Sequence, residues 1–335
     1  LAELGAVYDS GALSNRNLVI NGGMQVAQRG TSTTGIGASS AFGSVDRFQC
    51  ASSTTGRVTM AQDSVTDLAG FSKCIKLSCT TARTPTSGEI MLLRYAFEGH
   101  DLQRIGKGLA GAKETRLSFY VKASGAFTFA AELYDVDNAR HISQLFTTTT
   151  GWNRIELTIP ADVDDGSSPY DNDNAVGLLM QLWIHAGTSR TSGTLATSWA
   201  NAVQANQAVG ISNFLSSTSN EFYFTGMQYE VGTEVTPFEH RLFGDELERC
   251  QRYFYKETYS GSGPYATQYV ASHRMVHLFH PTTMRAVPTS TTSYSGGTMS
   301  EYQSTARHFK AYISAQYDST GQNYLQTSYQ ADAEL

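Results

Sequence analysis

Charged residues and cysteines are scarce in this sequence. Asp, Glu, Lys and Arg make up 16% of the 335 residues, whereas about a quarter is usual for globular proteins. Four cysteines are few for a domain held together by disulfides, and the lack of a CxxC pair argues against a thioredoxin-like motif or a zinc knuckle. We interpret the cysteines as buried thiols of a protein made in a reducing cytoplasm: Cys50, Cys74, Cys79 and Cys250.

Long runs of one residue type are also missing. No cluster of Lys or Arg occurs and the formal net charge is −6, so the sequence lacks the clustered positive charge that a nucleic acid backbone requires. No apolar stretch approaches the roughly 20 residues that span a bilayer as a helix. We therefore expect neither a nucleic acid partner nor insertion into a membrane.

The signature motifs of several common enzyme classes do not occur. The sequence contains no GxSxG, P-loop, GxGxxG or HExxH, which mark serine hydrolases, nucleotide-binding enzymes and zinc peptidases. These absences favour a binding or structural role, and we predict that the protein is not an enzyme.

Polarity comes mainly from Ser, Thr, Asn, Gln and Gly, accompanied by 18 Tyr and 16 Phe. β-Branched and aromatic residues fit pleated sheets. Residues 115–123 and 153–159 alternate between apolar and polar side chains, which is typical of antiparallel strands with one buried face. Similar segments recur along the chain, whereas residues 30–44 are rich in Gly, Ser and Thr and predict a loop. The pattern predicts an all-β protein built on an antiparallel jelly-roll β-sandwich.

One segment follows a helical pattern instead. Asp245 can cap a first turn with Glu248 three residues later, as in a capping box, and Leu247, Cys250 and Phe254 share one face. We therefore predict four parts: an N-terminal attachment arm at 1–16, a jelly-roll domain at 17–240, a short helical linker at 241–256 and a small C-terminal β domain at 257–335.

The densest acidic segment is a candidate calcium site. Asp162, Asp164, Asp171 and Asp173 supply carboxylate oxygens, which are ligands that Ca²⁺ prefers. The spacing is not that of an EF-hand, because Ser167 stands where that loop needs glycine. Two interpretations stay open, a calcium site and a solvated turn whose Asp and Asn side chains bond their own backbone. Apart from calcium, we expect no cofactor.

Trp199 is the tryptophan with the best prospect of exposure, because its surroundings are loop-like. A flat aromatic face can pack against the apolar C–H face of a sugar ring. Asp164, Asp171 and Asp173 are the other candidates for glycan binding, in loops that we expect at one end of the sandwich. The alternative for Trp199 is a structural one, in which its ring closes the end of the sandwich.

Other constellations have a structural interpretation. Trp183 lies in a continuous apolar run and is expected to belong to the core. Glu132, Asp135 and Asp137 lie near one strand end, but nothing in the sequence places two carboxyl groups across a groove as glycosidases require. A zinc site is not favoured either, because a strand would not bring all three neighbouring histidines to one face: His273, His277 and His280.

Several blocks of the sequence resemble known proteins. Residues 117–123 (LSFYVKA) and 149–154 (TTGWNR) look like strands of jelly-roll carbohydrate-binding modules, and residues 226–239 (GMQYEVGTEVTPFE) look like the closing strand of such modules in phage proteins. Further blocks are similar to motifs of phage virion proteins: 17–30 (NLVINGGMQVAQRG), 250–256 (CQRYFYK), 280–289 (HPTTMRAVPT) and 332–335 (DAEL). Together they resemble bacteriophage virion structural proteins of the tail fibre and tail spike family.

The resemblance implies a virion protein, made in the host cytoplasm, that attaches the particle to a glycan on the host surface. Fibres of this kind resemble homotrimers, in which many weak contacts add up through multivalency. The arm at 1–16 would then bind other virion proteins. Two alternatives stay open: a head decoration, head fibre or other accessory virion protein without glycan binding, and a capsule depolymerase. The lack of an internal repeat counts against the depolymerase, since such spikes usually build repeated solenoids.

Overall fold

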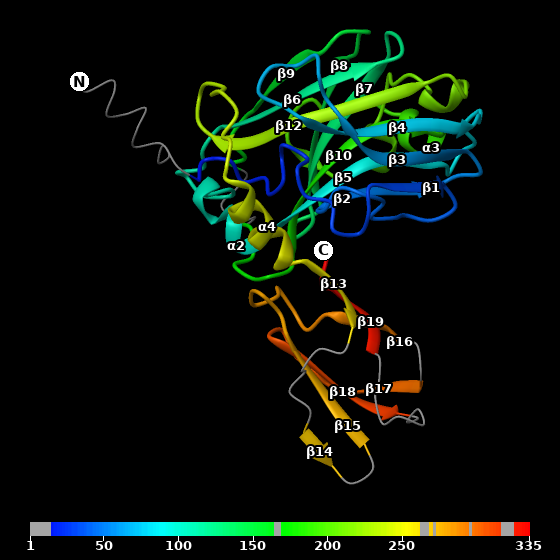
Figure 1. Ribbon diagram of the computed structural model, residues 1–335. Coiled ribbons are helices and arrows are strands. Elements are labelled where there is room, and N and C mark those ends of the chain that lie inside the picture. Colours follow the sequence, from blue (N-terminus) through cyan, green and yellow to red (C-terminus); the bar gives the residue numbers. More distant parts are fainter. Residues whose placement is uncertain (1–14, 164–168, 262–267, 271–272, 295–296, 316–324) are drawn as a thin grey trace. The chain divides into compact units, whose positions relative to one another are not determined.

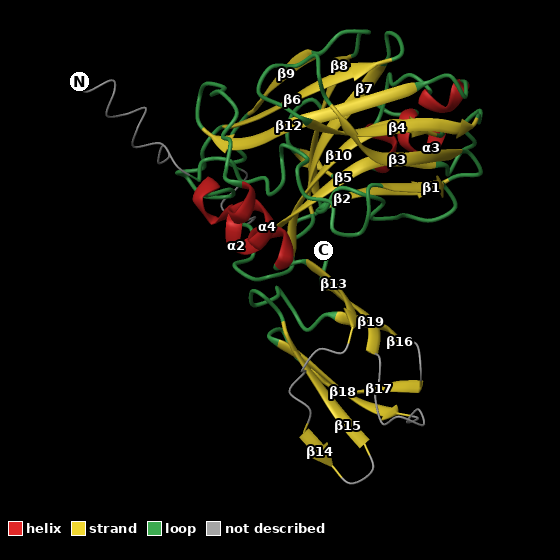
Figure 2. Ribbon diagram, in the orientation of Figure 1, coloured by secondary structure: helices red, strands yellow, loops and turns green. Residues whose placement is uncertain are grey.

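The computed structural model describes residues 15–163, 169–261, 268–270, 273–294, 297–315 and 325–335. The chain divides into two compact units, and the division falls between Phe243 and Gly244, inside the segment for which a linker was predicted. Both units consist mainly of strands, and their helices are short (Figure 2). Among the described helices, none has the length and apolar character needed to cross a membrane.

The first unit is an antiparallel sandwich of two six-stranded sheets (Figure 1). One sheet contains, in spatial order, β1 (Ser32–Ile36), β3 (Arg57–Ser64), β4 (Lys73–Thr81), β12 (Glu221–Val231), β6 (Thr115–Ala123) and β9 (Asn153–Ile159). The other contains β11 (Ala200–Asn201), β8 (Arg140–Thr147), β7 (Thr128–Asp135), β10 (Val176–Ala186), β5 (Ile90–Glu98) and β2 (Phe48–Ser53). Strands distant in sequence lie side by side, as in a jelly roll. The predicted fold class is confirmed.

The core between the two sheets follows the predicted alternation. Leu117, Phe119 and Val121 of β6 are buried, whereas Arg116 and Lys122 on the opposite face are partly exposed. Aromatic rings from both sheets interlock in this core, in edge-to-face and tilted pairs that add to the hydrophobic stabilisation: Phe48, Phe97, Phe119, Phe129, Phe146, Phe222 and Phe224. The four cysteines are buried and free, as the sequence predicted.

One expected loop contains a strand. The prediction of a loop over residues 30–44 was wrong for Ser32–Ile36, which form β1 and pair with β3 at the edge of the first sheet. The pairing is irregular, with a register shift between Thr33 and Ile36, and Gly35 adopts a φ of +74°. Backbone pairing with β3 defines this strand, so its composition alone did not reveal it.

Part of the outer face of the second sheet is covered by the chain that follows β10. This segment carries α3 (Thr188–Thr191), β11, η2 (Gln204–Asn206) and η3 (Phe214–Ser216). A second, smaller apolar cluster forms there: Ala51, Leu92, Ala130, Trp183, Ala186 and Ala208. The central strand β10 is therefore buried on both faces along most of its length, which explains its continuous apolar run. Trp183 is buried as expected, but in this outer cluster and not between the sheets.

The remaining short elements of the first unit are α2 (Gly99–Leu102) and η1 (Gln103–Ile105). The second unit contains two small antiparallel sheets. One has the order β13 (Phe254–Gly261), β19 (Leu325–Asp332) and β16 (Thr289–Tyr294); the other has β14 (Gln268–Val270), β15 (His273–Phe279), β18 (His308–Ala315) and β17 (Gly297–Ser304). Its apolar cluster is small: Leu278, Met284, Phe309, Ala311, Tyr329, Ala331 and Ala333.

The predicted helix exists with different ends. Helix α4 (Phe243–Gln251) begins before Asp245, which therefore lies in the first turn and does not precede the helix as a cap. Cys250 is buried as predicted, but Phe254 is the first residue of β13. The chain leaves the helix at a turn in which the Tyr253 amide donates to the Cys250 carbonyl. The helical stripe was thus extended one turn too far, because an aromatic residue fits the apolar face of a helix and of a strand equally well.

Candidate functional site

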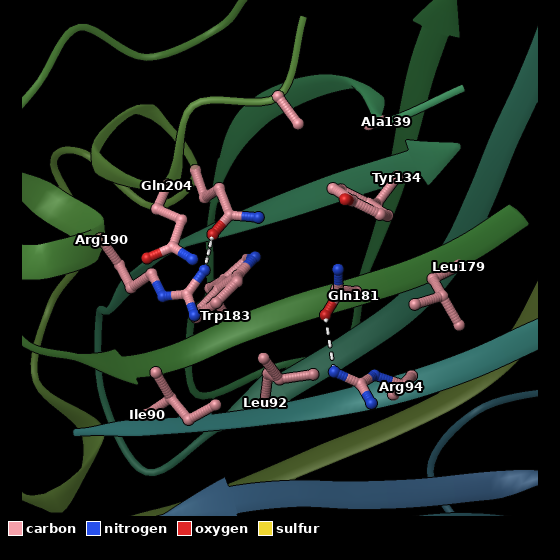
Figure 3. Close-up of a pocket in the computed structure, with 12 residues that line it drawn as sticks. Ile90, Leu92, Arg94, Tyr134, Ala139, Leu179, Gln181, Trp183, Arg190 and Gln204 are labelled. Carbon is pink, nitrogen blue, oxygen red and sulfur yellow. Dashed lines mark hydrogen bonds between the residues drawn. The ribbon is translucent and has the colours of Figure 1, made fainter. Parts of the chain in front are cut away.

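A pocket of about 310 Å³ lies on the partly covered outer face of the second sheet (Figure 3). Strands β5, β7 and β10 form its base, and the segment after β10 forms its rim. Its lining is a mixture of aliphatic, amide, guanidinium and aromatic groups: Ile90, Leu92, Arg94, Tyr134, Ala139, Leu179, Gln181, Trp183, Arg190, Ala202, Gln204 and Gln207.

Strand register brings the side chains at the base together. Gln181 of β10 lies directly opposite Arg94 of β5, and Leu179 lies opposite Tyr134 of β7. Because alternate residues of a strand point to the same face, Gln181 and Leu179 both project toward the pocket while Leu182 points into the core. Pairing between strands that are distant in sequence thus defines the site.

A buried carboxylate organises the pocket from below. Glu132 of β7 is fully buried and accepts hydrogen bonds from Trp183 Nε1 at 2.7 Å, Gln207 Nε2 at 3.0 Å and Gln181 Nε2 at 3.3 Å. A buried carboxylate is tolerated only when its oxygens are satisfied in this way. These bonds hold two amide side chains and the indole of the lining in fixed orientations.

A histidine completes this network. His141 Nδ1 lies 2.8 Å from Glu132 Oε1, and its Nε2 accepts a hydrogen bond from the Val203 amide at 3.4 Å. The acceptor role of Nε2 assigns the proton to Nδ1, which donates to Glu132. Since Val203 belongs to the segment after β10, the network also anchors that segment to the sheet.

Two arginines reach the pocket from different elements (Figure 3). Arg94 Nη2 donates to Gln181 Oε1 at 3.2 Å, and burial lowers the pKa of Arg94, with the Glu132 carboxylate opposing this shift and Arg190 adding to it. Arg190, in α3, donates to Gln207 and lies over the Trp183 ring, 5.7 Å from its centroid. Both guanidinium groups therefore bond to neutral amide oxygens.

The sequence did not single out this pocket, although two weak signals were present. Gln181 interrupts the apolar run of β10, and Arg94 interrupts that of β5. A polar residue inside a central strand must find a partner, and each of the two is the other's. The covering segment could not be predicted, because it contains little regular structure.

Trp199, the aromatic candidate from the sequence, does not line this pocket. It is half-buried and packs against the main core, and its Nε1 donates to the Pro160 carbonyl at 2.9 Å. Lys107 Nζ lies 5.9 Å from the centre of its ring. These contacts agree with the structural interpretation, while part of the ring is left accessible.

The first residue of the acidic segment is engaged by cations. Asp162 is buried and accepts from Arg140 Nε at 2.8 Å and Arg140 Nη2 at 2.9 Å, with Lys107 Nζ at 3.3 Å. Burial alone would raise the pKa of Asp162, but the Arg140 hydrogen bond and the Lys107 charge lower it below its ordinary value. Lys107 is also 2.6 Å from Asp135, so a buried ion-pair network closes this end of the sandwich.

The other acidic candidates are dispersed. Asp164 lies outside the described residues, and Asp171 and Asp173 are exposed. The Asp173 carboxylate accepts from the Ala175 amide at 2.9 Å, and the Asp171 amide donates to Asp137 at 3.0 Å, as in a solvated turn. Over the described ranges, no three His, Cys, Asp or Glu side chains gather as metal ligands would. Calcium binding stays a prediction.

The histidines considered for zinc have other neighbours. His280 Nε2 lies 2.7 Å from the Tyr329 hydroxyl, and the His277 ring packs against Phe279 and His308. The side chain of His273 falls outside the part of the structure that is described.

No protein-family model and no curated protein sequence matches this chain. Similar solved structures are the family 11 carbohydrate-binding module of the cellulase Lic26A-Cel5E of Clostridium thermocellum (13% identity, 57% of this chain, 91% of that chain, TM-score 0.30) and the CBM22-1 xylan-binding domain of Paenibacillus barcinonensis Xyn10C (10%, 67%, 100%, 0.32). A putative sugar binding protein from Bacteroides thetaiotaomicron is similar at 11% identity, over 64% of this chain and 100% of that chain, with a TM-score of 0.34. At such identities and TM-scores we take the sandwich architecture from this chain's own strand order, and the class it defines is a two-unit all-β protein.

Proposed function

We propose that the pocket on the second sheet binds a glycan and that the protein is a non-enzymatic attachment protein of a bacteriophage particle. The observation that carries the binding proposal is the composition of the pocket. Amide and guanidinium groups of Gln181, Gln204, Gln207 and Arg94 surround a partly exposed aromatic residue, Tyr134, on a rigid sheet.

Sugar recognition needs groups that both donate and accept hydrogen bonds, as well as a flat apolar surface. Glutamine amides supply both functions, and the ring of Tyr134 supplies an apolar face. Because Glu132 already fixes Gln181 and Gln207, little side-chain freedom is lost when a ligand binds, which favours affinity.

The lining supports binding over hydrolysis. A glycosidase needs two carboxyl groups at a defined separation across the sugar. Among the described residues that line the pocket, the charged ones are Arg94 and Arg190. Glu132 lies beneath them with its oxygens bonded to protein donors.

The particle assignment rests on the sequence blocks that resemble phage tail fibre and tail spike proteins. A homotrimer would present three copies of the pocket, and three weak sites on one particle convert modest affinities into firm attachment. The arm at 1–16 would bind the rest of the particle.

A second candidate function is an accessory virion protein, such as a head decoration or head fibre, that binds no glycan. Phe279, Val287 and Tyr302 of the second unit are exposed by 67%, 64% and 57%, and exposed large apolar side chains are common at protein interfaces. This candidate predicts contacts with other virion proteins in place of sugar binding.

Binding of the purified protein to an array of bacterial surface polysaccharides tests the proposal, with duplicate spots oxidised by periodate. We expect binding to a subset of spots, lost after oxidation. Tyr134→Ala should weaken it about tenfold, since it removes the aromatic face. The matched control is Tyr223→Ala, which removes a partly exposed tyrosine from the first sheet and should leave binding unchanged. Absence of binding to every spot, or equal losses in both variants, would overturn the proposal.

A further inference from the structure

The charges of the pocket differ from those of the whole chain, and they bear on the class of glycan. The protein has a formal net charge of −6. The pocket nevertheless carries two arginines in its lining and one carboxylate, Glu132, beneath it. The acidic protein thus holds a local excess of positive charge in the site to which binding is assigned above, and this inference rests on that proposed function.

The two arginines are placed on either side of the same side chains. In Figure 3, Gln181 and Trp183 lie between Arg94, on β5, and Arg190, on α3. Arg94 is positioned by its bond to Gln181, and Arg190 is positioned by its bond to Gln207 and its contact with the Trp183 ring. Both are held by their surroundings, which limits their ability to turn away into solvent.

Their hydrogen bonds leave charge without a counter-charge. Arg94 donates to the amide oxygens of Gln181 and Gln49, and Arg190 donates to that of Gln207. In the described part of the chain, no carboxylate lies within ion-pair distance of either guanidinium group, and Arg94 Nε is buried without a hydrogen-bond partner. Amide oxygens satisfy donors but do not neutralise a cation, so an anion entering the pocket would meet attraction that the protein has not used.

The site of the charge also matters. Partial burial lowers the effective dielectric around Arg94, which strengthens its interaction with a bound anion relative to an exposed lysine. Like-charge repulsion between Arg94 and Arg190, which contributes to the lowered pKa of Arg94, would be relieved by a negative group in the same pocket.

We infer that the pocket selects acidic glycans: a sugar whose carboxylate or phosphate group is attracted by Arg94 and Arg190 while its ring packs on Tyr134. Guanidinium groups match carboxylate and phosphate oxygens through paired donors, which makes arginine suited to both. Neutral sugars would still use the glutamine amides, but without the charge-assisted bonds.

The test uses polysaccharides printed in matched pairs. Each uronic acid polymer is printed beside its carboxyl-reduced form, and each phosphorylated polymer beside its dephosphorylated form, and binding of the full chain is measured at low and at high NaCl. We expect at least tenfold tighter binding to one acidic member than to its neutral counterpart, and a several-fold loss at high salt. The arm that responds distinguishes a carboxylate from a phosphate ligand.

Three variants assign the effect to the arginines. Arg190→Gln and Arg94→Lys should each reduce the preference for the acidic member; the lysine keeps the charge but loses the paired donors, and both variants are checked for folding by thermal unfolding. Lys73→Gln removes one positive charge from β4 in the first sheet and should leave the preference intact.

The outcomes separate this inference from the proposed function. Equal binding to acidic and neutral members, or binding to neutral members alone, overturns the acidic selectivity and leaves glycan binding standing. Binding to no polymer overturns both. Retention of the acidic preference by folded Arg190→Gln and Arg94→Lys would also overturn the inference.

Discussion

The outer faces of the two sheets are built by the same strand alternation, but they neutralise their charges differently. On the first sheet, Lys122 Nζ lies 2.8 Å from Asp67, and Lys76 Nζ lies 2.7 Å from Glu221. Tyr223 lies beside both lysines, with its ring centroid 4.9 Å from Lys122 Nζ. Every one of these cations has a carboxylate partner at the surface.

The outer face of the second sheet separates its charges. Its carboxylate, Glu132, is buried and bonded to Trp183, His141 and two glutamines, while Arg94 and Arg190 bond to amides near the opening. A surface that pairs its own ions has little attraction left for a ligand, because exposed ion pairs are already satisfied and screened. A surface that keeps cations on neutral partners retains that attraction, and we expect function on the second face.

Replacing the buried carboxylate should give the largest difference between the two faces. Glu132→Ala leaves four donors without an acceptor in a buried position, and we expect the free energy of unfolding to fall by about 3–5 kcal/mol. Glu221→Ala, on the first sheet, should lower it by less than about 1 kcal/mol. Urea denaturation of both variants measures the difference. Similar losses would mean that the Glu132 network is not the stabilising element described here.

Acid should also distinguish buried from surface carboxylates. Burial alone would raise the pKa of Glu89, but bonds from the Thr86 amide and from Arg83 lower it from 4.5 to about 2. A lowered pKa in the folded protein means that the stabilisation is complete above about pH 4.5 and is lost as the pH falls toward 2. We expect a loss of up to about 3 kcal/mol across this window.

Glu89→Gln is the variant that isolates this contribution. It should be less stable than the wild type at pH 7 and should show a flatter dependence of unfolding free energy on pH between 4.5 and 2. Glu221→Gln should change the profile less, since Glu221 is more exposed. Parallel profiles for wild type and Glu89→Gln would contradict the assignment.

Indole hydrogen bonds give a smaller contrast. Trp183→Phe removes the donor that bonds Glu132 at 2.7 Å in a buried site, and we expect a loss of about 1–3 kcal/mol. Trp152→Phe removes a bond of 2.8 Å to the exposed Asp67, where water can replace the indole, so the loss should stay below about 1 kcal/mol. Thermal and urea unfolding of the two variants would show the difference, and equal losses would argue against it.

The sequence predicted the sandwich because its evidence is local. Alternation along 115–123 identifies one buried and one outer face without knowledge of partner strands. The pocket depends on long-range register instead: Arg94 and Gln181 lie 87 residues apart and meet only because β5 pairs with β10. Glu132 was noted as a carboxylate near a strand end, but its donors come from β8, β10 and the irregular segment after β10. Neither periodicity nor composition reports such pairings.

The smallest effect is expected where charge is already balanced. Lys122→Ala removes a contact with Asp67 and with the rings of Trp152 and Tyr223, yet the partly exposed lysine should contribute less than about 1 kcal/mol to stability. Binding to polysaccharide should not change, whereas removal of one positive charge from the pocket by Arg190→Gln should weaken it. Titration calorimetry with the polysaccharide identified on the array compares the two. If Lys122→Ala weakened binding as much as Arg190→Gln, the two faces would be functionally equivalent, and the contrast in how they neutralise charge would have no bearing on which face binds the glycan.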